Sequence, residues 1–306
     1  MDTGPYANVY GAPPQDLVGS AAGLTQYSPL VPGSKALEDA APQSLDGLIM
    51  LAPPGTLERR YAIALALRAL KPDSALLVLA PKDKGGSRLA GDLETLGCHF
   101  QESSKRHHRL CVTQSSGDPQ AIAHAISEGA PRFDENLGLW TQPGVFSWNR
   151  LDPGSALLLD HLPALSGKGA DLGCGIGILA HAALASGLVT SLTLIELDAR
   201  ALSCARRNVN EKRAHFMQAD LRKLNAPALK GLDFIIMNPP FHDGGAEDRS
   251  LGQIFIKTAA GLLRKGGHLY CVANRHLPYE AALKEHFRRV DVLAERDGFK
   301  IFAALA

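Results

Sequence analysis

Residues 170–179 read "ADLGCGIGIL", and this loop limits the possible fold more than any other segment of the chain. The apolar residues before the loop predict a short strand, and the small residues of "IGILAHAALAS" after it predict a helix. Glycine permits a tight turn and lets a ligand lie against the backbone, while the first turn of a helix offers N–H groups to negative charge. Asp171-x-Gly173-x-Gly175-x-Gly177 therefore indicates an α/β fold with a binding loop, although a plain strand-to-helix turn has the same pattern.

The alternation of strand and helix continues to the end of the chain. We predict strands at "SLTLIE" (191–196), "AHFMQAD" (214–220), "LDFIIMN" (232–238) and "HLYCVAN" (268–274), with helices between them. The last two strands flank Asp297-Gly298, which is a strong signal for a hairpin turn. Repeated strand–helix units imply an α/β class protein with a doubly wound, Rossmann-like parallel sheet, closed here by an antiparallel hairpin.

The first part of the chain resembles the second in three places. "SLDGLIMLAPPG" (44–55) parallels "GLDFIIMNPPF" (231–241), "ALKPDSALLVLAPKDK" (69–84) parallels "LLRKGGHLYCVANRH" (262–276), and residues 98–114 resemble the terminal hairpin. We therefore predict two tandem copies of one fold, a domain over residues 1–120 and a second domain, with a lead-in segment, over 121–306. The first copy has Leu51-Ala52 where the second has Asn238, and residues 1–45 contain no glycine-rich strand end. We expect it to be degenerate and without chemistry.

The bulk properties of the chain exclude several classes of protein. It has 306 residues, 45% of them hydrophobic, and a formal net charge of +1, so any basic surface that attracts nucleic acid is local. Its five cysteines are scattered and lack C-x-x-C spacing, which indicates reduced thiols rather than disulfides or a metal site. The start "MDTGPYANVYG" lacks the basic and apolar segments of a signal peptide. We expect a cytoplasmic protein with no metal and no membrane segment.

Acidic residues stand at the ends of the two strands that follow the glycine loop. Glu196 is placed to accept both hydroxyls of a ribose, and Asp220 is placed to accept an adenine amine. Each has a simpler explanation as a helix N-terminal charge or a turn cap, but together with the loop they favour an adenosine cofactor. The loop lacks the G-x-G-x-x-G of NAD sites and the Lys-Ser/Thr of nucleoside triphosphate sites. Asp171 suits a cationic group, which points to S-adenosylmethionine, because its amino acid part carries an ammonium.

The segment "DFIIMNPPFHDGG" (233–245) ends a buried strand in an unusual tip. Its two prolines remove two backbone donors and fix two φ angles, and the first of them also holds Asn238 in an extended conformation. The tip presents one amide side chain, carbonyls without competing N–H groups, and the ring of Phe241. Such a tip is suited to holding a flat, polar substrate.

Asp171-x-Gly173-x-Gly175-x-Gly177, Glu196, Asp220 and Asn238-Pro239-Pro240-Phe241 together resemble the class I S-adenosylmethionine-dependent methyltransferases that act on planar amines. The two-domain plan and the segments "PGVFSWNRLDPGSALLL" (143–159), "NPPFHDGG" (238–245) and "VANRHLPYE" (272–280) more closely resemble the ribosomal RNA guanine-N2 methyltransferases of the RsmC type. This resemblance implies methyl transfer from S-adenosylmethionine to the exocyclic N2 of a guanine in 16S ribosomal RNA. The implied partner is ribosomal RNA or a small-subunit particle.

The resemblance also implies roles for single residues. The side-chain oxygen of Asn238 and the carbonyl of Pro239 would accept the two N–H bonds of the guanine amine and so help aim its lone pair at the methyl group. Phe241 would stack on the base. Asn238 also borders the cofactor, and Phe146, Ser147 and Ser155 would cover its methionine end. Asn274 and Tyr279 would border the base pocket.

Several alternatives stay open on the sequence alone. Similar tips serve methyltransferases of 23S ribosomal RNA guanines, of adenine N6 and of protein glutamines, and a non-catalytic RNA-binding assembly factor is a further alternative. "KRHHR" (105–109) is an exposed hairpin tip or, if the first domain grips RNA, a phosphate contact through Lys105, Arg106 and Arg109. "RRNVNEKR" (206–213) is interpreted as ordinary helix-end charge.

Overall fold

The computed structural model describes residues 5–114, 116–224, 226–240, 242–243, 246–247, 249–277 and 279–306, without the side chains at 242–250. The chain forms two compact units, Met1–Pro131 and Arg132–Ala306. The division follows Pro131, rather than residue 120, because helix α4 (Pro119–Gly129) packs against α2 (Thr56–Ala69) of the first unit.

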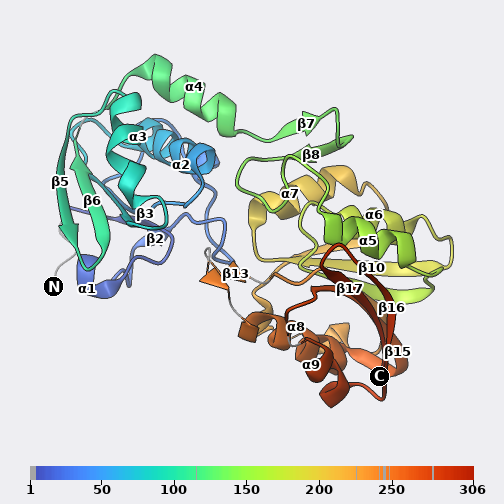
Figure 1. The fold of residues 1–306 in the computed structure, drawn as a ribbon. Helices are drawn as coiled ribbons and strands as arrows, with labels where there is room; N and C mark the ends of the chain where they lie inside the picture. Colours follow the sequence, from blue (N-terminus) through green and yellow to red (C-terminus); the bar gives the residue numbers. More distant parts are fainter. Residues whose placement is uncertain are drawn as a thin grey trace. The chain divides into compact units, whose positions relative to one another are not determined.

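The second unit is built on a seven-stranded sheet with the strand order β11-β10-β9-β12-β15-β17-β16 (Figure 1). Its strands are β9 (Gly167–Leu172), β10 (Val189–Glu196), β11 (Ala214–Gln218), β12 (Leu232–Met237), β15 (Leu263–Asn274), β16 (Arg289–Arg296) and β17 (Phe299–Leu305). Neighbouring strands are parallel, except that β17 is antiparallel to both β15 and β16. The predicted Rossmann-like sheet with a terminal hairpin is confirmed.

Helices cover both faces of this sheet, as expected for a doubly wound fold. They are α5 (Pro153–His161), α6 (Ile178–Leu184), α7 (Ala199–Asn208), α8 (Arg249–Leu262) and α9 (Tyr279–His286). Two short antiparallel pairs accompany them, β7 (Arg132–Asp134) with β8 (Leu139–Thr141), and β13 (His242–Asp243) with β14 (Ala246–Glu247).

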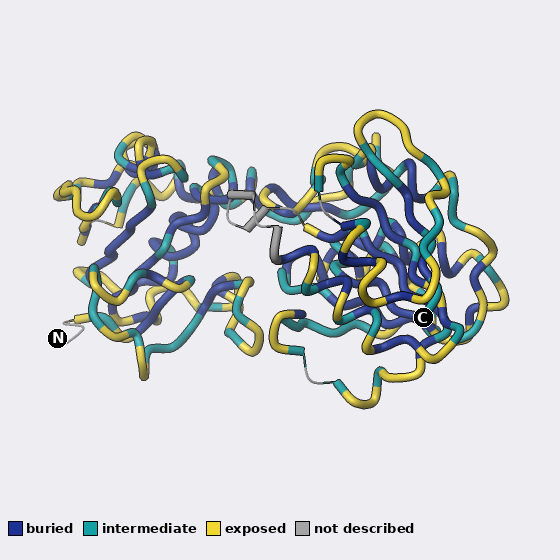
Figure 2. Tube along the Cα trace, turned by 60° about the horizontal axis from the view of Figure 1, so that its bottom comes forward, coloured by how far each residue is buried: buried dark blue, intermediate teal, exposed yellow. Residues whose placement is uncertain are grey.

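The apolar run of β12 is buried on both faces, which is why its sequence is continuous rather than alternating. Phe234 and Ile236 pack into the cluster that contains residues of α5, α6 and α7, whereas Ile235 and Met237 pack into the cluster that contains residues of α8 and α9. Figure 2 shows the resulting buried interior of the unit in dark blue. The central strand is therefore packed on both faces, and its carboxyl end places Asn238 at the edge of this core.

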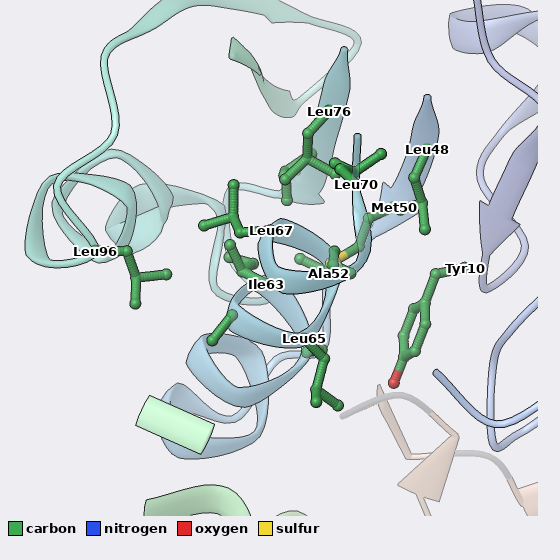
Figure 3. Packing of buried hydrophobic residues seen from close by; sticks show 14 of the residues in the cluster. Tyr10, Leu48, Met50, Ala52, Ile63, Leu65, Leu67, Leu70, Leu76 and Leu96 are labelled. Atoms are coloured by element: carbon green, nitrogen blue, oxygen red, sulfur yellow. The ribbon is translucent and has the colours of Figure 1, made fainter. Parts of the chain in front are cut away.

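The first unit has a six-stranded sheet in the order β2-β1-β3-β4-β6-β5. Its strands are β1 (Asn8–Tyr10), β2 (Thr25–Gln26), β3 (Leu48–Leu51), β4 (Leu76–Pro81), β5 (Phe100–Lys105) and β6 (His108–Thr113), and its other helices are α1 (Gln15–Val18) and α3 (Leu89–Thr95). Figure 3 shows its core, in which Ile63 and Leu67 of α2 lie among residues of the sheet such as Met50 and Leu76.

The two sheets repeat one another in order and in register. β4-β6-β5 of the first corresponds to β15-β17-β16 of the second. A parallel bridge joins Leu45 to Leu70 in the first unit, and the equivalent bridge joins Leu232 to Leu263 in the second. In each unit the acid after the first bridge residue pairs with a cation, Asp46 with Lys71 and Asp233 with Arg264, both at 2.7 Å. The predicted tandem duplication is confirmed.

All five cysteines are buried free thiols. Within the described residues, no helix has the length and apolar character needed to cross a membrane.

Candidate active site

Three neighbouring strands of the second unit bring the main predicted site residues to one edge of the sheet. β9 lies between β10 and β12, and both are parallel to it, so the carboxyl ends of all three strands meet. Asp171 is the penultimate residue of β9, Glu196 is the last residue of β10, and Asn238 follows β12 directly. Open α/β sheets bind their ligands at this edge.

The glycine loop leaves space for a ligand at Gly175. Its φ is +54°, and a Cβ added there would meet no atom of the described residues within 4 Å. Gly177 differs, because a Cβ there would lie 2.9 Å from Cγ2 of Val209, just beyond α7. Gly177 thus allows α6 to begin close to the end of α7, whereas Gly175 allows a ligand to approach the backbone. Gly173 takes φ +73° over the ring of Phe255.

Glu196 joins β10 to this loop through backbone donors. Its Oε1 accepts hydrogen bonds from the N–H groups of Leu197 (2.7 Å) and Asp198 (3.0 Å), and its Oε2 accepts one from Gly175 (2.9 Å). Burial raises the pKa of Glu196, and the backbone donors oppose this shift. A carboxylate has about four lone-pair directions, and these three donors leave one of them, on Oε2, for a ligand hydroxyl.

Asp171 is fully buried below the loop, and neither of its carboxyl oxygens has a hydrogen-bond partner in the described part of the chain. Burial, followed by the charge of Glu196, raises the pKa of Asp171 to about 8. The amide of Ala180 opposes this shift without completing a hydrogen bond of ordinary geometry. Because a buried carboxylate without a donor is costly, a cationic ligand at this loop would stabilise its ionised form.

The amide of Asn238 is held in one orientation by residues of α5. Its Nδ2 donates to Oδ2 of Asp152 and to Oγ of Ser155, both at 2.8 Å. Oδ2 of Asp152 also accepts the backbone N–H of Ser155 at 2.7 Å and so caps α5. The Asp152 carboxylate only accepts hydrogen bonds, so the atom facing it is the amide nitrogen, and with Ser155 both N–H bonds of that nitrogen are used. The oxygen of Asn238 is therefore the atom that remains for a ligand, and it acts only as an acceptor.

The neighbours of Asn238 differ in how far they are exposed. Pro239 is buried and Pro240 is exposed. Phe241 lies outside the described residues. Ser155, which was expected at the methionine end of the cofactor, is 6% exposed and bonds the Asn238 amide.

Asp220 caps a turn in the structure. Its Oδ1 accepts hydrogen bonds from the backbone N–H of Arg222 (3.0 Å) and from Nε of the same residue (2.8 Å), at the start of the 3-10 helix Leu221–Lys223. The Arg222 guanidinium is the main cause of a lowered pKa at Asp220. The simpler of the two explanations from sequence is thus present, and an adenine contact is a separate proposal.

The lead-in segment contacts the glycine loop through Val145, and a contact of Phe146 or Ser147 with the cofactor stays a prediction. Val145 is 3% exposed and packs with Ile176 of the glycine loop, whereas the neighbouring Phe146 is 57% exposed. Oγ of Ser147 donates to the carbonyl of Arg150 at 2.9 Å in a left-handed turn with φ +58°.

The two residues expected at the base pocket lie in different surroundings. Asn274 ends β15, and its carbonyl accepts the N–H of Leu277. Tyr279 is 1% exposed in the core, packed so closely on Gly252 that a Cβ there would lie 1.9 Å from the tyrosine oxygen. The structure thus makes Tyr279 a core residue.

Two residues near the site were not identified from the sequence. Asp152 is one of them, because nothing in the sequence pattern links it to an amide 86 positions later. Asn208 ends α7 and donates from Nδ2 to the carbonyls of Trp140 and Ile176, both at 2.9 Å, while its Oδ1 accepts the N–H of Trp140 at 2.7 Å. It therefore connects β8 to the glycine loop.

In the first unit, the equivalent positions are bonded by the unit's own side chains. Gln26 ends β2 as Glu196 ends β10, and its Oε1 accepts the N–H groups of Tyr27 and Ser28, both at 3.0 Å, and of Gly11 at 3.1 Å. Its Nε2 donates to the carbonyl of Gly11 at 2.8 Å.

The tip of the first unit is bonded in the same manner. Nη1 of Arg59 donates to the carbonyls of Pro53 (3.3 Å) and Pro54 (2.7 Å), the prolines that follow Ala52. Arg59 is fully buried, and its Nε bonds Asp92 at 2.6 Å. These contacts occupy backbone groups at the positions where the second unit has its candidate site.

The basic hairpin of the first unit has local counter-charges. Arg106 pairs with Asp16, and Arg109 pairs with Glu102. Two of the three cations considered for a phosphate contact thus face carboxylates, and that contact stays a prediction. Within the described ranges, no three His, Cys, Asp or Glu side chains gather as they would around a metal ion.

The comparison with known proteins agrees with this site. Residues 136–303 match the family model of the methyltransferase small domain. The ribosomal RNA small subunit methyltransferase C of Shewanella halifaxensis is 33% identical over 267 residues, which cover 85% of this chain and 77% of that protein. The protein of the same name from Stutzerimonas stutzeri is 33% identical over 311 residues, which cover 96% and 93%.

A solved structure extends the likeness to the fold. The T. thermophilus 16S rRNA N2 methyltransferase (RsmC), in complex with AdoMet and guanosine, has a TM-score of 0.73 and 24% identity, over 97% of this chain and 81% of that one. The family model covers more than half of this chain, and both relatives are 33% identical to it over most of the length of each protein. This protein therefore belongs to the methyltransferase small domain family, among the ribosomal RNA small subunit methyltransferase C proteins.

Proposed function

We propose that this protein transfers a methyl group from S-adenosylmethionine to the N2 amine of a guanine in 16S ribosomal RNA. Two relatives are named ribosomal RNA small subunit methyltransferase C, and the related T. thermophilus fold belongs to a 16S rRNA N2 methyltransferase that holds AdoMet and guanosine. The observation that carries the proposal is the orientation of Asn238, whose nitrogen is held by Asp152 and Ser155 so that its oxygen is left as an acceptor.

The residues of the glycine loop fit the cofactor on structural grounds. Gly175 has open space over its Cα, Glu196 is fastened beside it with acceptor capacity to spare, and Asp171 is a buried carboxylate without a partner in the described chain. Glu196 would accept a ribose hydroxyl through Oε2, Asp171 would compensate the ammonium, and Asp220 would border the adenine. The cofactor supplies a methyl group bonded to a positively charged sulfur.

The tip is suited to activating a poor nucleophile. The lone pair of a guanine amine is delocalised into the ring, so the amine must be oriented and its developing charge stabilised. Oδ1 of Asn238 and the carbonyl of Pro239 would each accept one N–H bond, and no N–H of Pro240 competes for them. These two acceptors would hold the amine while its lone pair takes the methyl group that the cofactor would supply, the sulfur would keep the electron pair of the bond it gives up, and the proton lost by the amine would pass to solvent. Phe241 would stack on the base.

We infer that the first unit is a degenerate copy without a cofactor site. Gln26 and Arg59 bond the backbone groups that correspond to the loop and the tip of the second unit. The place of such an enzyme is the cytoplasm, where the small ribosomal subunit is assembled.

Mass spectrometry of nucleosides tests the function. The protein is incubated with S-adenosylmethionine and either an unmodified 16S ribosomal RNA transcript or small-subunit particles that contain it. We expect N2-methylguanosine from at least one of these substrates, and none with the Asn238→Ala protein under the same conditions. N6-methyladenosine, or no methylated nucleoside from either substrate, would contradict the proposal.

A further inference from the structure

Two arginines near the end of α7 lie against aromatic rings. The guanidinium carbon of Arg206 is 4.6 Å from the ring centroid of Phe216, and that of Arg207 is 4.4 Å from the ring centroid of Trp140. Phe133 meets Trp140 edge-on at 6.2 Å between centroids, and Phe133 is itself 45% exposed. We call these five residues the arginine–aromatic surface. Figure 1 shows β7 and β8, which carry the two hairpin aromatics, beside α7.

The other arginines of the same segment pair with carboxylates, whereas Nη2 of Arg206 donates a hydrogen bond to the carbonyl of Phe216 at 3.4 Å. Arg200 pairs with Asp198 at 2.7 Å. Arg213 pairs with Glu211 at 2.9 Å and also donates to three backbone carbonyls. Neither Arg206 nor Arg207 pairs with a carboxylate of the described residues, and both are exposed. Each thus offers uncompensated positive charge and N–H donors at the edge of a flat guanidinium that a ring holds in place.

The arginine–aromatic surface lies next to the glycine loop. Trp140 packs against a buried cluster that contains Ile176 of the loop. Asn208, which follows Arg207, bonds both Trp140 and the carbonyl of Ile176. Anything held on this surface therefore lies beside the loop that borders the candidate site.

We propose that the arginine–aromatic surface binds the ribosomal RNA strand next to the target guanine, with Arg206 and Arg207 on phosphates and Phe133 stacked on a base. This inference rests on the proposed function, since it names how that substrate is held. Single-stranded RNA is bound by arginine and by exposed aromatic rings, and a chain of net charge +1 needs local cations to hold phosphate. The hairpin at 105–109 is the weaker candidate, because Arg106 and Arg109 face carboxylates.

The test compares RNA binding by the double variant R206Q/R207Q with that of R264Q/R289Q. The control removes the same charge from two arginines that pair with acids elsewhere in the unit, Asp233 and Asp291. We expect R206Q/R207Q to weaken binding of an unmodified 16S ribosomal RNA transcript by about tenfold or more, and to lower the slope of log Kd against log salt by about 1.4–1.8, as two lost phosphate contacts require. The control should stay within about twofold of the unsubstituted protein.

Further measurements separate the possible outcomes. S-adenosylmethionine affinity by calorimetry should be the same in all proteins, which excludes misfolding. Phe133→Ser, which alters no charge, should weaken RNA binding without changing the salt slope. Equal salt slopes for the two double variants would overturn the inference. If R206Q/R207Q lost affinity for small-subunit particles but not for the free RNA transcript, the surface would bind a ribosomal protein, and the inference would be overturned as well.

The readout is binding, so it does not depend on methylation. If the unsubstituted protein methylates neither substrate, the proposed function is contradicted. If it methylates RNA but R206Q/R207Q binds RNA as the control does, only the RNA-binding role of the arginine–aromatic surface is contradicted.

Discussion

At the scale of single side chains, neighbouring groups restrict each site residue to one orientation and one hydrogen-bonding role. An asparagine amide can present a donor or an acceptor, and a substrate amine requires an acceptor. At Asn238 the choice is made by Asp152 and Ser155, which use both N–H bonds of the amide. The same logic applies to Glu196, whose backbone donors fix the carboxylate before any ligand arrives. Both groups are preorganised, which reduces the cost of reorientation during the reaction.

Replacing Asn238 should separate chemistry from binding. We expect Asn238→Ala to lower kcat by about 10²–10³, because the lost acceptor acts on charge that develops in the transition state. RNA affinity should change by less than about threefold, since phosphate contacts dominate it. Single-turnover methylation and RNA titration measure the two quantities. Asn210→Ala, at an exposed position after α7, is the control. An Asn238→Ala enzyme with normal turnover would exclude the role given to the tip.

Asp171 makes stability and cofactor binding depend on pH. Its pKa is raised from 3.8 to about 8 in the folded protein, so the folded state holds a proton that the unfolded state loses above pH 4. Its contribution to stability is complete below pH 4 and is lost as the pH rises toward 8. A cationic ligand reverses the preference, because it favours the ionised carboxylate.

Two measurements follow for Asp171. Between pH 5 and 8, thermal unfolding of the unliganded protein should lose stability with rising pH, and Asp171→Asn should flatten this trend, with a gain on the order of a few kcal/mol at pH 7. Calorimetry in two buffers of different ionisation enthalpy should show proton release when S-adenosylmethionine binds at pH 7, and the Asn variant should show none. Equal proton release by both proteins would place the titrating group elsewhere.

At the scale of helices and strands, the sequence was sufficient to predict those features that a short local pattern determines. The glycine loop, the strand ends and the hairpin at Asp297-Gly298 are each fixed by a short pattern, and each is where the pattern predicts. Patterns failed where contacts join distant segments. Asn208 bonds Trp140 across 68 positions, and Val145 packs with Ile176 of the loop, which it precedes by 31 positions. The cap at Asp220 was open to two interpretations, since a carboxylate at a strand end suits both.

The buried ion pair of the first unit should matter for stability but not for the site. Asp92 is 2% exposed and bonds Nε of both Arg59 and Arg60. Asp92→Ala would leave the charge of Arg59 buried without its partner, so we expect a loss of about 3–5 kcal/mol from the first unit. Denaturant unfolding, with limited proteolysis to detect the unfolded first unit, measures this loss of free energy of unfolding. Cofactor affinity should be unchanged, and the Asp46→Ala protein, which loses only an exposed pair with Lys71, should lose less than about 1 kcal/mol.

Over the complete chain, duplication left two copies of the same framework with different uses. The strand order, the bridges and the acid–cation pairs recur in both units, so the framework that folds is shared. What differs are the groups at the carboxyl edge. Where the second unit has the carboxylate of Glu196, the first has the amide of Gln26, which bonds both the N–H and the carbonyl of Gly11. Arg59 donates to the carbonyls of the two prolines of the tip. The first unit thus bonds backbone groups at its own carboxyl edge, which supports the proposal that it has no cofactor site.

One cofactor site per chain follows from this difference. Calorimetric titration with S-adenosylmethionine should give a stoichiometry of one, because Gln26 and Arg59 occupy the groups that a second cofactor would need. Glu196→Ala should weaken this single site by about 1–3 kcal/mol, the cost of ribose hydrogen bonds left without a partner. Gln26→Ala should leave both affinity and stoichiometry as they are, since it lies in the other unit. If the first unit did bind cofactor, the Glu196→Ala protein would retain a site of undiminished affinity, and the titration would resolve it as a separate step with the original heat.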